Sequence, residues 1–337
     1  MTPKEKIRRR RRITAIALLF AAVIIIFLIG CCTGRYAVPV PEVFRTLAGG
    51  GSAKARLAII DFRLPRVCLA VLVGIGMGTS GVIMQSLLHN DLASPGTLGV
   101  ADGSSLFMLL YVGLLQGKIE NPVLLPILAL FGGMLAAVII YLLSTKKNKP
   151  ISSVKLVMTG VAMGAGFSAV STFMMYVLDE SQLEFVQRWQ SGELWGTEWT
   201  YILILFVWLL VFCGLAMYFA RVLNAIALGN DLATGLGVNM HVMFPFLAFL
   251  AVGMSSASVA FGGNFFFLGL IGPHIARRMV GTDARYLLPA AGAVSALIIT
   301  ASNILVENVS LLTNVPTGIF VSILSVPYFL YLLIKSR

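Results

Sequence analysis

An apolar segment with closely spaced glycines constrains this chain more than any other feature. The segment 63–103 places Gly74, Gly76, Gly78 and Gly81 within one run of apolar residues. Lipid offers no hydrophobic drive for helices to associate, so small residues at their interfaces allow the close backbone contacts that hold them together. The glycine spacing therefore predicts a transmembrane helix packed tightly against other protein. A simple lipid anchor would not need so many glycines.

The composition identifies the whole chain as a polytopic membrane protein of the all-α class. Of its 337 residues, 58% are hydrophobic and 12% are charged, and the charged share is about half that of a soluble protein. The mean hydropathy is +0.92. A stretch of about 20 apolar residues crosses the hydrocarbon core of a bilayer, which is about 30 Å thick. We expect about ten transmembrane helices, at 13–34, 65–88, 96–115, 122–144, 154–178, 200–220, 241–260, 264–280, 286–310 and 315–334.

The distribution of basic residues predicts the orientation of these helices. Residues 4–12 contain seven basic side chains and one acid, and such a cluster before the first apolar span holds the N-terminus in the cytoplasm. With ten spans, the C-terminus is cytoplasmic as well. The same cluster is also compatible with a nucleic-acid-binding arm or a signal peptide, but no small-residue cleavage site follows it. We therefore expect a multi-pass membrane protein that binds no nucleic acid, with both termini in the cytoplasm.

Two segments on the predicted outer side stand out. A basic group, Lys54, Arg56, Arg63 and Arg66, lies between the first two spans and runs against the orientation bias. It is either a solvated loop that the membrane tolerates or a binding surface, and we favour binding. The segment 181–198 is too polar to span, and its apolar and tryptophan side chains favour an amphipathic stretch at the outer interface.

The sequence shows no catalytic machinery. It lacks a G-x-x-x-x-G-K-[ST] phosphate-binding loop, and its three histidines lie far apart. The four cysteines lie in or beside apolar spans without metal-ligand spacing. We therefore expect no catalytic residues, no disulfide, no metal site and no cofactor. A transporter driven by ATP would need a separate ATPase beside this chain.

Several motifs resemble the permease family of type II ABC importers, which take up iron-siderophores, haem and cobalamin. The segments that carry the resemblance are Arg63-Leu64-Pro65-Arg66, Ser80-Gly81 with Gln85, Asn90-Asp91-Leu92-Ala93, Leu228 to Val238, Gly269 to Arg277 and Thr282 to Pro289. Three positions depart from the family pattern. Asp91 stands in place of the usual proline, Glu193 stands in place of serine, and Glu307 lies where many relatives carry arginine.

The resemblance implies a permease subunit made of one transmembrane domain, residues 1–337. This domain would comprise a basic cytoplasmic tail at 1–12, an outer amphipathic segment at 181–198 and a cytoplasmic coupling loop at 221–240. The implied partners are a second permease (identical or a paralogue), two ABC ATPase subunits and an extracytoplasmic substrate-binding protein. The implied cargo is an iron(III)-siderophore, with haem or cobalamin as alternatives.

The resemblance also assigns roles to particular residues. The binding protein would dock on Arg63 and Arg66. The residues that would receive the ATPase are Gly229, Asn230, Asp231, Ala233, Gly235, Leu236 and Gly237. The residues that would form the cytoplasmic gate are Asn90, Leu92, Ser152 and Ser153.

Two other classes of function remain open at this point. A proton-driven secondary transporter would use Asp102 and Glu307 with His274. Such transporters usually show inverted repeats with broken helices, and the sequence does not show them. A membrane scaffold that transports nothing is the other class. Vanadate-sensitive uptake that depends on an ATPase would distinguish the importer from both.

Overall fold

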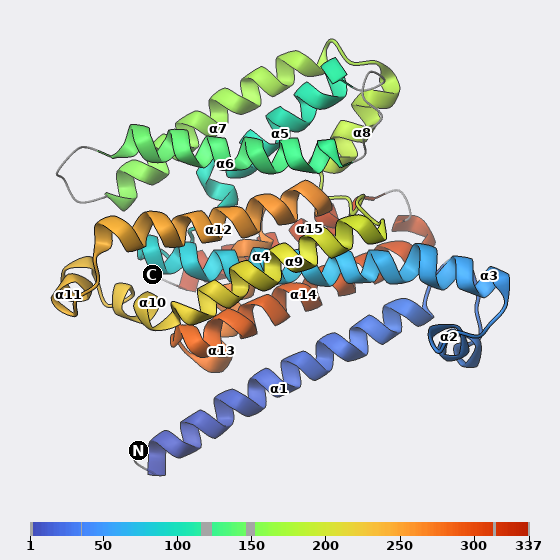
Figure 1. The fold of residues 1–337 in the computed structure, drawn as a ribbon, viewed down its shortest axis with the longest axis horizontal. Helices are drawn as coiled ribbons and strands as arrows, with labels where there is room; N and C mark the ends of the chain where they lie inside the picture. The colour runs from blue at the N-terminus through green and yellow to red at the C-terminus, as the bar shows by residue number, and fades with distance from the viewer. Residues whose placement is uncertain (1–2, 35, 116–122, 146–151, 313–314, 336–337) are drawn as a thin grey trace.

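The computed structural model describes residues 3–34, 36–115, 123–145, 152–312 and 315–335. Ten helices make up most of this described part (Figure 1). They are α1 (Pro3–Cys32), α4 (Leu64–Leu88), α5 (Val100–Leu110), α6 (Leu124–Ser144), α7 (Ser153–Met175), α9 (Trp199–Tyr218), α12 (Met240–Gly262), α13 (Leu268–Val280), α14 (Ala284–Asn308) and α15 (Thr317–Lys335). Each lies within or overlaps one of the ten spans expected from the sequence.

Short helices lie at the two ends of the bundle. One end carries α2 (Val40–Leu47), α3 (Ala53–Arg56) and α8 (Glu180–Gln190), and the other carries α10 (Ala220–Ile226) and α11 (Asn230–Gly235) (Figure 1). We call these the α3 end and the α11 end. A π-helical stretch, η1 (Leu57–Arg63), joins α3 to α4, so that residues 53–88 form one long helical rod.

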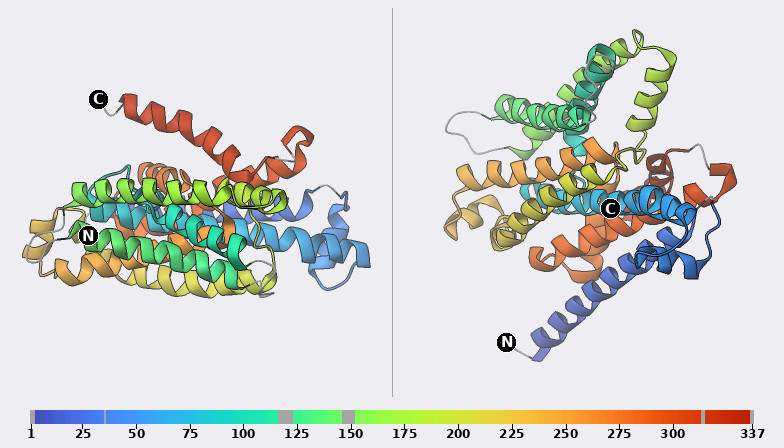
Figure 2. Two further views of the ribbon diagram at one scale, coloured as in Figure 1. Left: turned by 90° about the horizontal axis from the view of Figure 1, so that it is seen from above. Right: turned by 45° about the vertical axis from the view of Figure 1, so that its right-hand side comes forward.

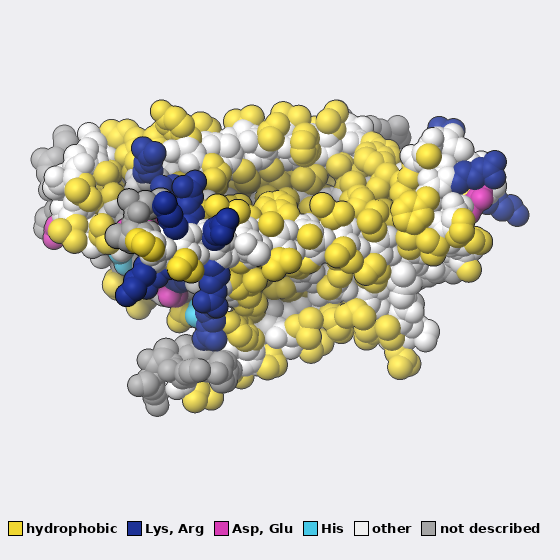
Figure 3. All heavy atoms as spheres, turned by 90° about the horizontal axis from the view of Figure 1, so that it is seen from below, with side chains coloured by type: hydrophobic (Ala, Val, Ile, Leu, Met, Phe, Trp, Pro, Cys, Tyr) yellow, Lys and Arg dark blue, Asp and Glu magenta, His cyan; other side chains and the backbone are white. Residues whose placement is uncertain are grey.

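The surface of the bundle is that of a multi-pass membrane protein. Seven helical stretches of the described residues are long and apolar enough to cross a membrane. Figure 3 shows a face covered by hydrophobic side chains, with Lys and Arg gathered toward the two ends. This arrangement confirms the polytopic all-α class predicted from the composition.

Two expected spans are shorter in the structure than the sequence suggests. In 96–115, the 11-residue α5 continues as a π-helical stretch, η3 (Tyr111–Leu115). The segment 264–280 contains only the 13-residue helix α13, which is about 20 Å long and does not reach across a hydrocarbon core of about 30 Å. Its N-terminal half packs on the C-terminal half of α4. A Cβ atom added to Gly81 of α4 would overlap the carbonyl oxygen of Gly269 in α13. The expectation of a full span is therefore wrong here, and α13 is a half-span that ends at the α11 end.

Two other segments differ from their expected form. The basic residues 4–12 belong to α1, which begins at Pro3 and continues into the apolar span. They are therefore the first turns of that helix. In the segment 181–198, α8 turns its apolar face inward, because Val186 and Trp189 are buried and join the hydrophobic core. The apolar side chains of this segment therefore pack on protein.

The glycines of α4 bring its backbone against the neighbouring helices, as their spacing predicts. A Cβ added to Gly74 would overlap the backbone of Ala296 in α14, and one added to Gly78 would overlap the carbonyl oxygen of Ala291. Contacts this close are available only to glycine, because every other residue carries a Cβ atom. The α3–α4 rod is also the most deeply buried of the seven candidate spans.

We expect Gly78→Leu to destabilise the protein strongly, because backbone of α14 fills the space that the side chain needs. Overpacking of this kind costs about 1–3 kcal/mol or more. Thermal unfolding in detergent micelles measures the effect. Gly214→Leu in α9 is the matched control, because a Cβ at Gly214 meets no atom within 4 Å. Equal unfolding midpoints for the two variants would contradict the importance of the α4–α14 contact.

The segment between α4 and α5 enters the bundle without being helical throughout. Residues 93–96 are buried, and a short 3-10 turn, η2 (Gly96–Leu98), leads to Gly99 with φ +76°. A Cβ at Gly99 would lie 2.9 Å from the carbonyl oxygen of Gly160 in α7. Irregular backbone is tolerated at membrane depth where protein covers it. α7 therefore covers this segment and sets where α5 begins.

A second irregular region joins three distant parts of the chain. The Gly318 amide donates to the Gly192 carbonyl (2.9 Å), and the Asn264 amide donates to the Trp189 carbonyl (3.3 Å). Gly192 and Gly263 both have φ +81°, a conformation that glycine adopts at no steric cost. These hydrogen bonds connect the end of α8, the α12–α13 connection and the start of α15. We call this region the glycine junction.

Candidate functional site

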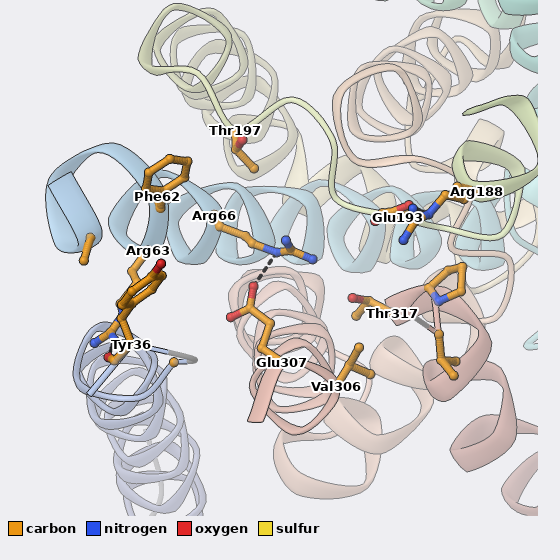
Figure 4. Close-up of a pocket in the computed structure, with 14 residues that line it drawn as sticks. Tyr36, Phe62, Arg63, Arg66, Arg188, Glu193, Thr197, Val306, Glu307 and Thr317 are labelled. Carbon is orange, nitrogen blue, oxygen red and sulfur yellow. Dashed lines mark hydrogen bonds and ion pairs between the residues drawn. The ribbon is translucent and has the colours of Figure 1, made fainter. Parts of the chain in front are cut away.

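A cleft of about 460 Å³ opens at the α3 end, between the start of α4 and the end of α14 (Figure 4). The charged side chains that line it are Arg63, Arg66, Arg188, Glu193 and Glu307. They come from η1, α4, α8, the segment after α8, and α14. The cleft therefore holds both signs of charge, and the partner of each arginine decides which cations are free to bind a ligand or another protein.

Arg66 is paired inside the chain. Its Nε lies 2.7 Å from Glu307 Oε1 and donates to Asn303 Oδ1 at 3.1 Å, and Thr317 donates to the same Asn303 oxygen. Figure 4 shows the Arg66 and Glu307 side chains meeting across the cleft. Glu307, which departs from the family pattern, therefore neutralises an arginine of its own chain. Arg66 remains half-buried at the rim.

Arg63, which we expect from the resemblance to be a docking residue, binds backbone carbonyls of its own chain. Its guanidinium is buried, with 8% of the residue exposed. It donates to the carbonyl oxygens of Cys31 (3.2 Å), Cys32 (3.3 Å) and Tyr36. The last carbonyls of a helix have no partner within the helix, and basic side chains commonly bind them. Arg63 therefore fastens the end of α1 to the start of α4, and its donors face backbone rather than solvent.

Three other cations at this end remain exposed. Lys54 and Arg56 lie on α3, and Arg45 lies on α2. The sequence pointed to Lys54 and Arg56 but missed Arg45, although Arg45 lies in the same predicted outer segment. Among the described residues, α2 and α3 therefore carry the exposed positive charge of the α3 end.

We expect the Arg66–Glu307 pair to be energetically coupled, because both side chains are half-buried. A double-mutant cycle with Arg66→Ala and Glu307→Ala should give a coupling free energy of about 1 kcal/mol in unfolding measurements. The pair Arg188 and Glu184 in α8 is the control, measured in a Glu193→Ala background because Arg188 also pairs with Glu193 at 2.7 Å. Helical pairs of this kind contribute only about 0.3–0.5 kcal/mol. Additive effects of the two Ala substitutions would refute the coupling.

At the α11 end, the predicted coupling segment forms two short helices. Gly229 (φ +117°) separates α10 from α11, and Gly237 (φ +88°) follows α11. Ala233 is buried, whereas Asp231, Gly235 and Leu236 are exposed. The segment is thus anchored by one small side chain and offers most of its surface to solvent.

The same segment carries a stripe of exposed leucines that the sequence analysis did not single out in full. Leu228, Leu232 and Leu236 are 63%, 60% and 67% exposed. Leu232 lies on α11, and Leu228 and Leu236 flank that helix. Three leucines within nine residues of a predicted cytoplasmic loop were the sequence signal for this surface. Exposed apolar side chains gathered at one end of a protein mark a surface for another protein.

The predicted gate residues of the first inner loop also lie at the α11 end. His89 ends α4 in the left-handed conformation, and its Nε2 lies 2.6 Å from the carbonyl oxygen of Ile226 in α10. The Leu92 amide donates to Asn90 Oδ1 (2.9 Å), which closes a tight turn, and both residues are exposed. Asp91, inside this turn, forms an ion pair with Arg277 of α13.

Arg277 connects this turn to the last turns of α4. Besides its ion pair with Asp91, it donates to Gln85 Oε1 of α4 at 2.9 Å. Asp91, like Glu307, departs from the family pattern and forms an ion pair with an arginine of this chain. The contact fixes the turn to the half-span α13.

The other two predicted gate residues begin α7. Ser152 is exposed and caps the helix by accepting a hydrogen bond from the Lys155 amide (3.4 Å), and Ser153 is the first helical residue. Residues 146–151, which carry the lysines expected in this loop, lie outside the described residues.

A charged cluster around Asp283 ties several helices together at the α11 end. Asp283 caps α14 and accepts hydrogen bonds from Arg285 and from Asn224 of α10. Arg12 Nη1 of α1 lies 3.8 Å from Asp283 Oδ2. The hydrogen bonds from Arg285 lower the pKa of the Asp283 carboxyl from 3.8 to about 2. The Asp283 carboxylate therefore stabilises the fold fully above pH 3.8, and this contribution is lost as the pH falls from 3.8 to about 2.

The residues of the alternative proton-driven mechanism do not form one site. Asp102 accepts a hydrogen bond from Ser168 of α7 (3.3 Å), His274 of α13 packs edge-on against Tyr328, and Glu307 pairs with Arg66. Each group has its own separate partner, so no proton relay joins the three. Within the described residues, no three His, Cys, Asp or Glu side chains gather as a metal site requires.

Comparison with known proteins gives a consistent result. The FecCD transport family matches residues 22–335. The iron(3+)-hydroxamate import system permease protein FhuG of Bacillus subtilis (strain 168) is 33% identical over 98% of this chain and 100% of its own length. The Fe(3+) dicitrate transport system permease protein FecD of Escherichia coli (strain K12) is 34% identical over 83% of this chain and 86% of its own length.

A solved structure is similar over nearly the same extent. It is described as an inward-facing conformation of a metal-chelate type ABC transporter. It covers 95% of this chain and 98% of its own, with a TM-score of 0.83 and 26% sequence identity.

Proposed function

This chain belongs to the FecCD transport family, and from that premise we propose that it forms the membrane path of an ABC importer for an iron(III) chelate, in the first place a siderophore. As a permease subunit it is not an enzyme, and ATP hydrolysis lies with a separate ATPase. The observation that carries the proposal is similarity over nearly the full length to permeases named for iron hydroxamate and iron dicitrate. These names favour an iron chelate over haem or cobalamin.

The α11 end is the cytoplasmic end in this proposal. The basic first turns of α1 and Arg277, Arg278 and Arg285 all lie there, as the positive-inside rule requires of a cytoplasmic side. Residues 1–337 then form one permease domain of the bacterial cytoplasmic membrane, with both termini inside. A second permease, identical or a paralogue, would complete the central path. The faces of α7 and α15 are candidates for that contact, because both helices leave large apolar side chains exposed.

The α10–α11 segment is the proposed contact with the two ATPases. The exposed leucines Leu228, Leu232 and Leu236 would enter an apolar cleft of the ATPase, with Gly229, Asn230, Asp231, Ala233, Gly235 and Gly237 shaping the surface around them. The buried Ala233 and the hydrogen bond between His89 and Ile226 would then transmit movement of this segment to α4.

The importer, reconstituted with its ATPase and binding protein, should accumulate a ferric siderophore only with ATP, and vanadate should stop it. Leu232→Glu and Leu236→Glu should each lower capture of the ATPase by about tenfold, because buried anchor residues dominate interfaces. Pull-down and uptake on the same membranes measure both effects.

Leu311→Glu is the control for this experiment, because Leu311 is 91% exposed at the α3 end and should not affect ATPase capture. Normal capture and uptake in both α11 variants would move the transmission site to another part of the α11 end. ATP hydrolysis by the isolated chain would end the permease interpretation altogether.

The proposed gate lies beside the coupling segment. Asn90 and Leu92 are exposed in the turn after α4, and Ser152 and Ser153 begin α7. The ion pair between Asp91 and Arg277 would hold the first of these two elements in place. Movement of α10 against His89 would shift this turn and so change the width of the opening.

The α3 end is the proposed docking surface for the extracytoplasmic binding protein. Arg66 at the rim, with the exposed Arg45, Lys54 and Arg56, would meet carboxylates of that protein. Arg63 would act beneath the surface, by holding the end of α1 in place. Complementary charge speeds the encounter of two proteins and weakens with salt.

Reversing two exposed charges tests this surface. Lys54→Glu with Arg56→Glu should weaken docking of the binding protein at low salt and reduce the dependence of docking on ionic strength. Surface plasmon resonance with the permease in nanodiscs measures both quantities. Arg221→Glu, an exposed reversal at the α11 end, should leave docking unchanged. A double variant that docks like the wild type, at every salt concentration, would assign these cations to solvation alone.

A further inference from the structure

A polar cavity of about 210 Å³ lies beside α7, between the middle of that helix and the end of α8. It is lined by Asp102, Ser105, Ser168, Ser171, Thr172, Met175, Gln190 and Asn264. Asp102 faces α7 at Gly164, the twelfth residue of that 23-residue helix. This places the carboxylate about half-way along a helix of about 35 Å, at a depth where polar groups are costly.

One hydrogen bond and the space beside a glycine position the Asp102 carboxylate at the cavity. Ser168 donates a hydrogen bond to Asp102 Oδ1 at 3.3 Å. A Cβ on Gly164 would lie only 2.8 Å from the other oxygen, Oδ2, so glycine at this position leaves room for the carboxylate. Among the described residues, no basic side chain forms an ion pair with Asp102. An acid in a transmembrane helix without a basic partner is a functional group by default.

Two more polar atoms at the cavity have no partner. Ser171 is 4% exposed, and its hydroxyl makes no hydrogen bond with the described residues. The side-chain oxygen of Asn264 is buried and equally without a partner there. Buried polar atoms are nearly always hydrogen-bonded in folded proteins. The lining therefore has unused donors and acceptors that a polar occupant would satisfy.

An apolar groove continues from this cavity along α15. The groove has a volume of about 510 Å³ and shares Gln190 and Asn264 with the cavity. Its other walls include Ile319, Ile323 and Val326 of α15. A molecule that carries a polar group on an apolar chain would therefore find matching surfaces side by side.

We propose that the Asp102 cavity selects the cargo by charge, and that it receives the ammonium group of an iron chelate whose net charge is zero or positive. This inference rests on the proposed import of an iron chelate and names the class that the path favours. The hydroxyls of Ser168, Ser171 and Thr172 would surround the ammonium group beside the carboxylate, and the apolar chain would lie along α15. A polyanionic chelate would be repelled, because charges interact strongly where water is scarce.

Two chelates that differ only in this group test the proposal. One is a linear ferric trihydroxamate with a free terminal amine, and the other is the same chelate with its amine acetylated. Initial uptake rates are measured with the complete importer in proteoliposomes, at saturating binding protein. The wild type should favour the amine form. Asp102→Asn should lower the amine-to-acetyl rate ratio by about tenfold, which corresponds to 1.4 kcal/mol.

Two further variants provide a second test of the cavity and a control. Thr172→Val removes one hydroxyl at nearly constant volume and should lower the ratio by about threefold, which decides the matter if Asp102→Asn fails to assemble. Asp61→Asn, at an exposed acid of the α3 end, should leave the ratio unchanged. ATPase capture is measured in parallel, because it should be the same in every variant.

Three outcomes would overturn the proposal. An unchanged ratio in both cavity variants would show that the cavity does not read the charge of the cargo. Uptake that requires sodium and does not discriminate between the two chelates would assign the cavity to a cation instead. A wild-type importer that takes up neither chelate, and no other ferric siderophore, would refute the proposed function on which the inference rests.

Discussion

The contact between the backbones of α4 and α14 is the constraint on which the rest of the structure depends. Gly74 and Gly78 allow the two helices to approach until no side chain separates them, which is how helices associate where water does not drive them together. Both ends of α4 carry functional elements. The rim arginines precede and begin it, and His89 and the gate turn follow it. One tightly held helix therefore fixes the distance between the proposed docking surface and the proposed gate.

Ion pairs at the two ends complete this framework. Glu307 pairs with Arg66 at the α3 end, and Asp91 pairs with Arg277 at the α11 end. Both acids depart from the pattern of the family that the sequence resembles, and each meets an arginine of the same chain. The third departure, Glu193, likewise pairs with Arg188, so each of these acids is neutralised within the chain. Within the part of the chain that the structure describes, the exposed cations on α2 and α3 are then available to a partner.

Much of this fold follows from the sequence, because the physics of a bilayer is strict about length and polarity. The ten spans, the tight packing of 65–88 and the family could all be inferred from runs of apolar residues and from motifs. The half-span α13 could not be inferred, because a short apolar stretch has the same composition whether it crosses the bilayer or stops half-way. Arg63 shows a second limit, since the sequence does not tell whether a guanidinium near a helix end faces solvent or backbone carbonyls. The Asp102 cavity needs residues from four separate segments, namely α5, α7, α8 and the α12–α13 connection, and only the folded chain brings them together.

The glycine junction has a mechanical consequence for α15. The start of this helix is hydrogen-bonded, through Gly318, to the end of α8, whereas Figure 2 shows the rest of α15 rising away from the bundle. Further along, Tyr328 of α15 packs against His274 of α13, but the backbone hydrogen bond lies at the start of the helix, so α15 can tilt as a lever about that end. The 19 residues of α15 form an arm of about 28 Å, so a tilt of about 10° at the pivot displaces the far tip by about 5 Å. A small change of angle at the glycine junction would thus displace the far tip of α15 by nearly one helical turn, on the opposite side of the membrane.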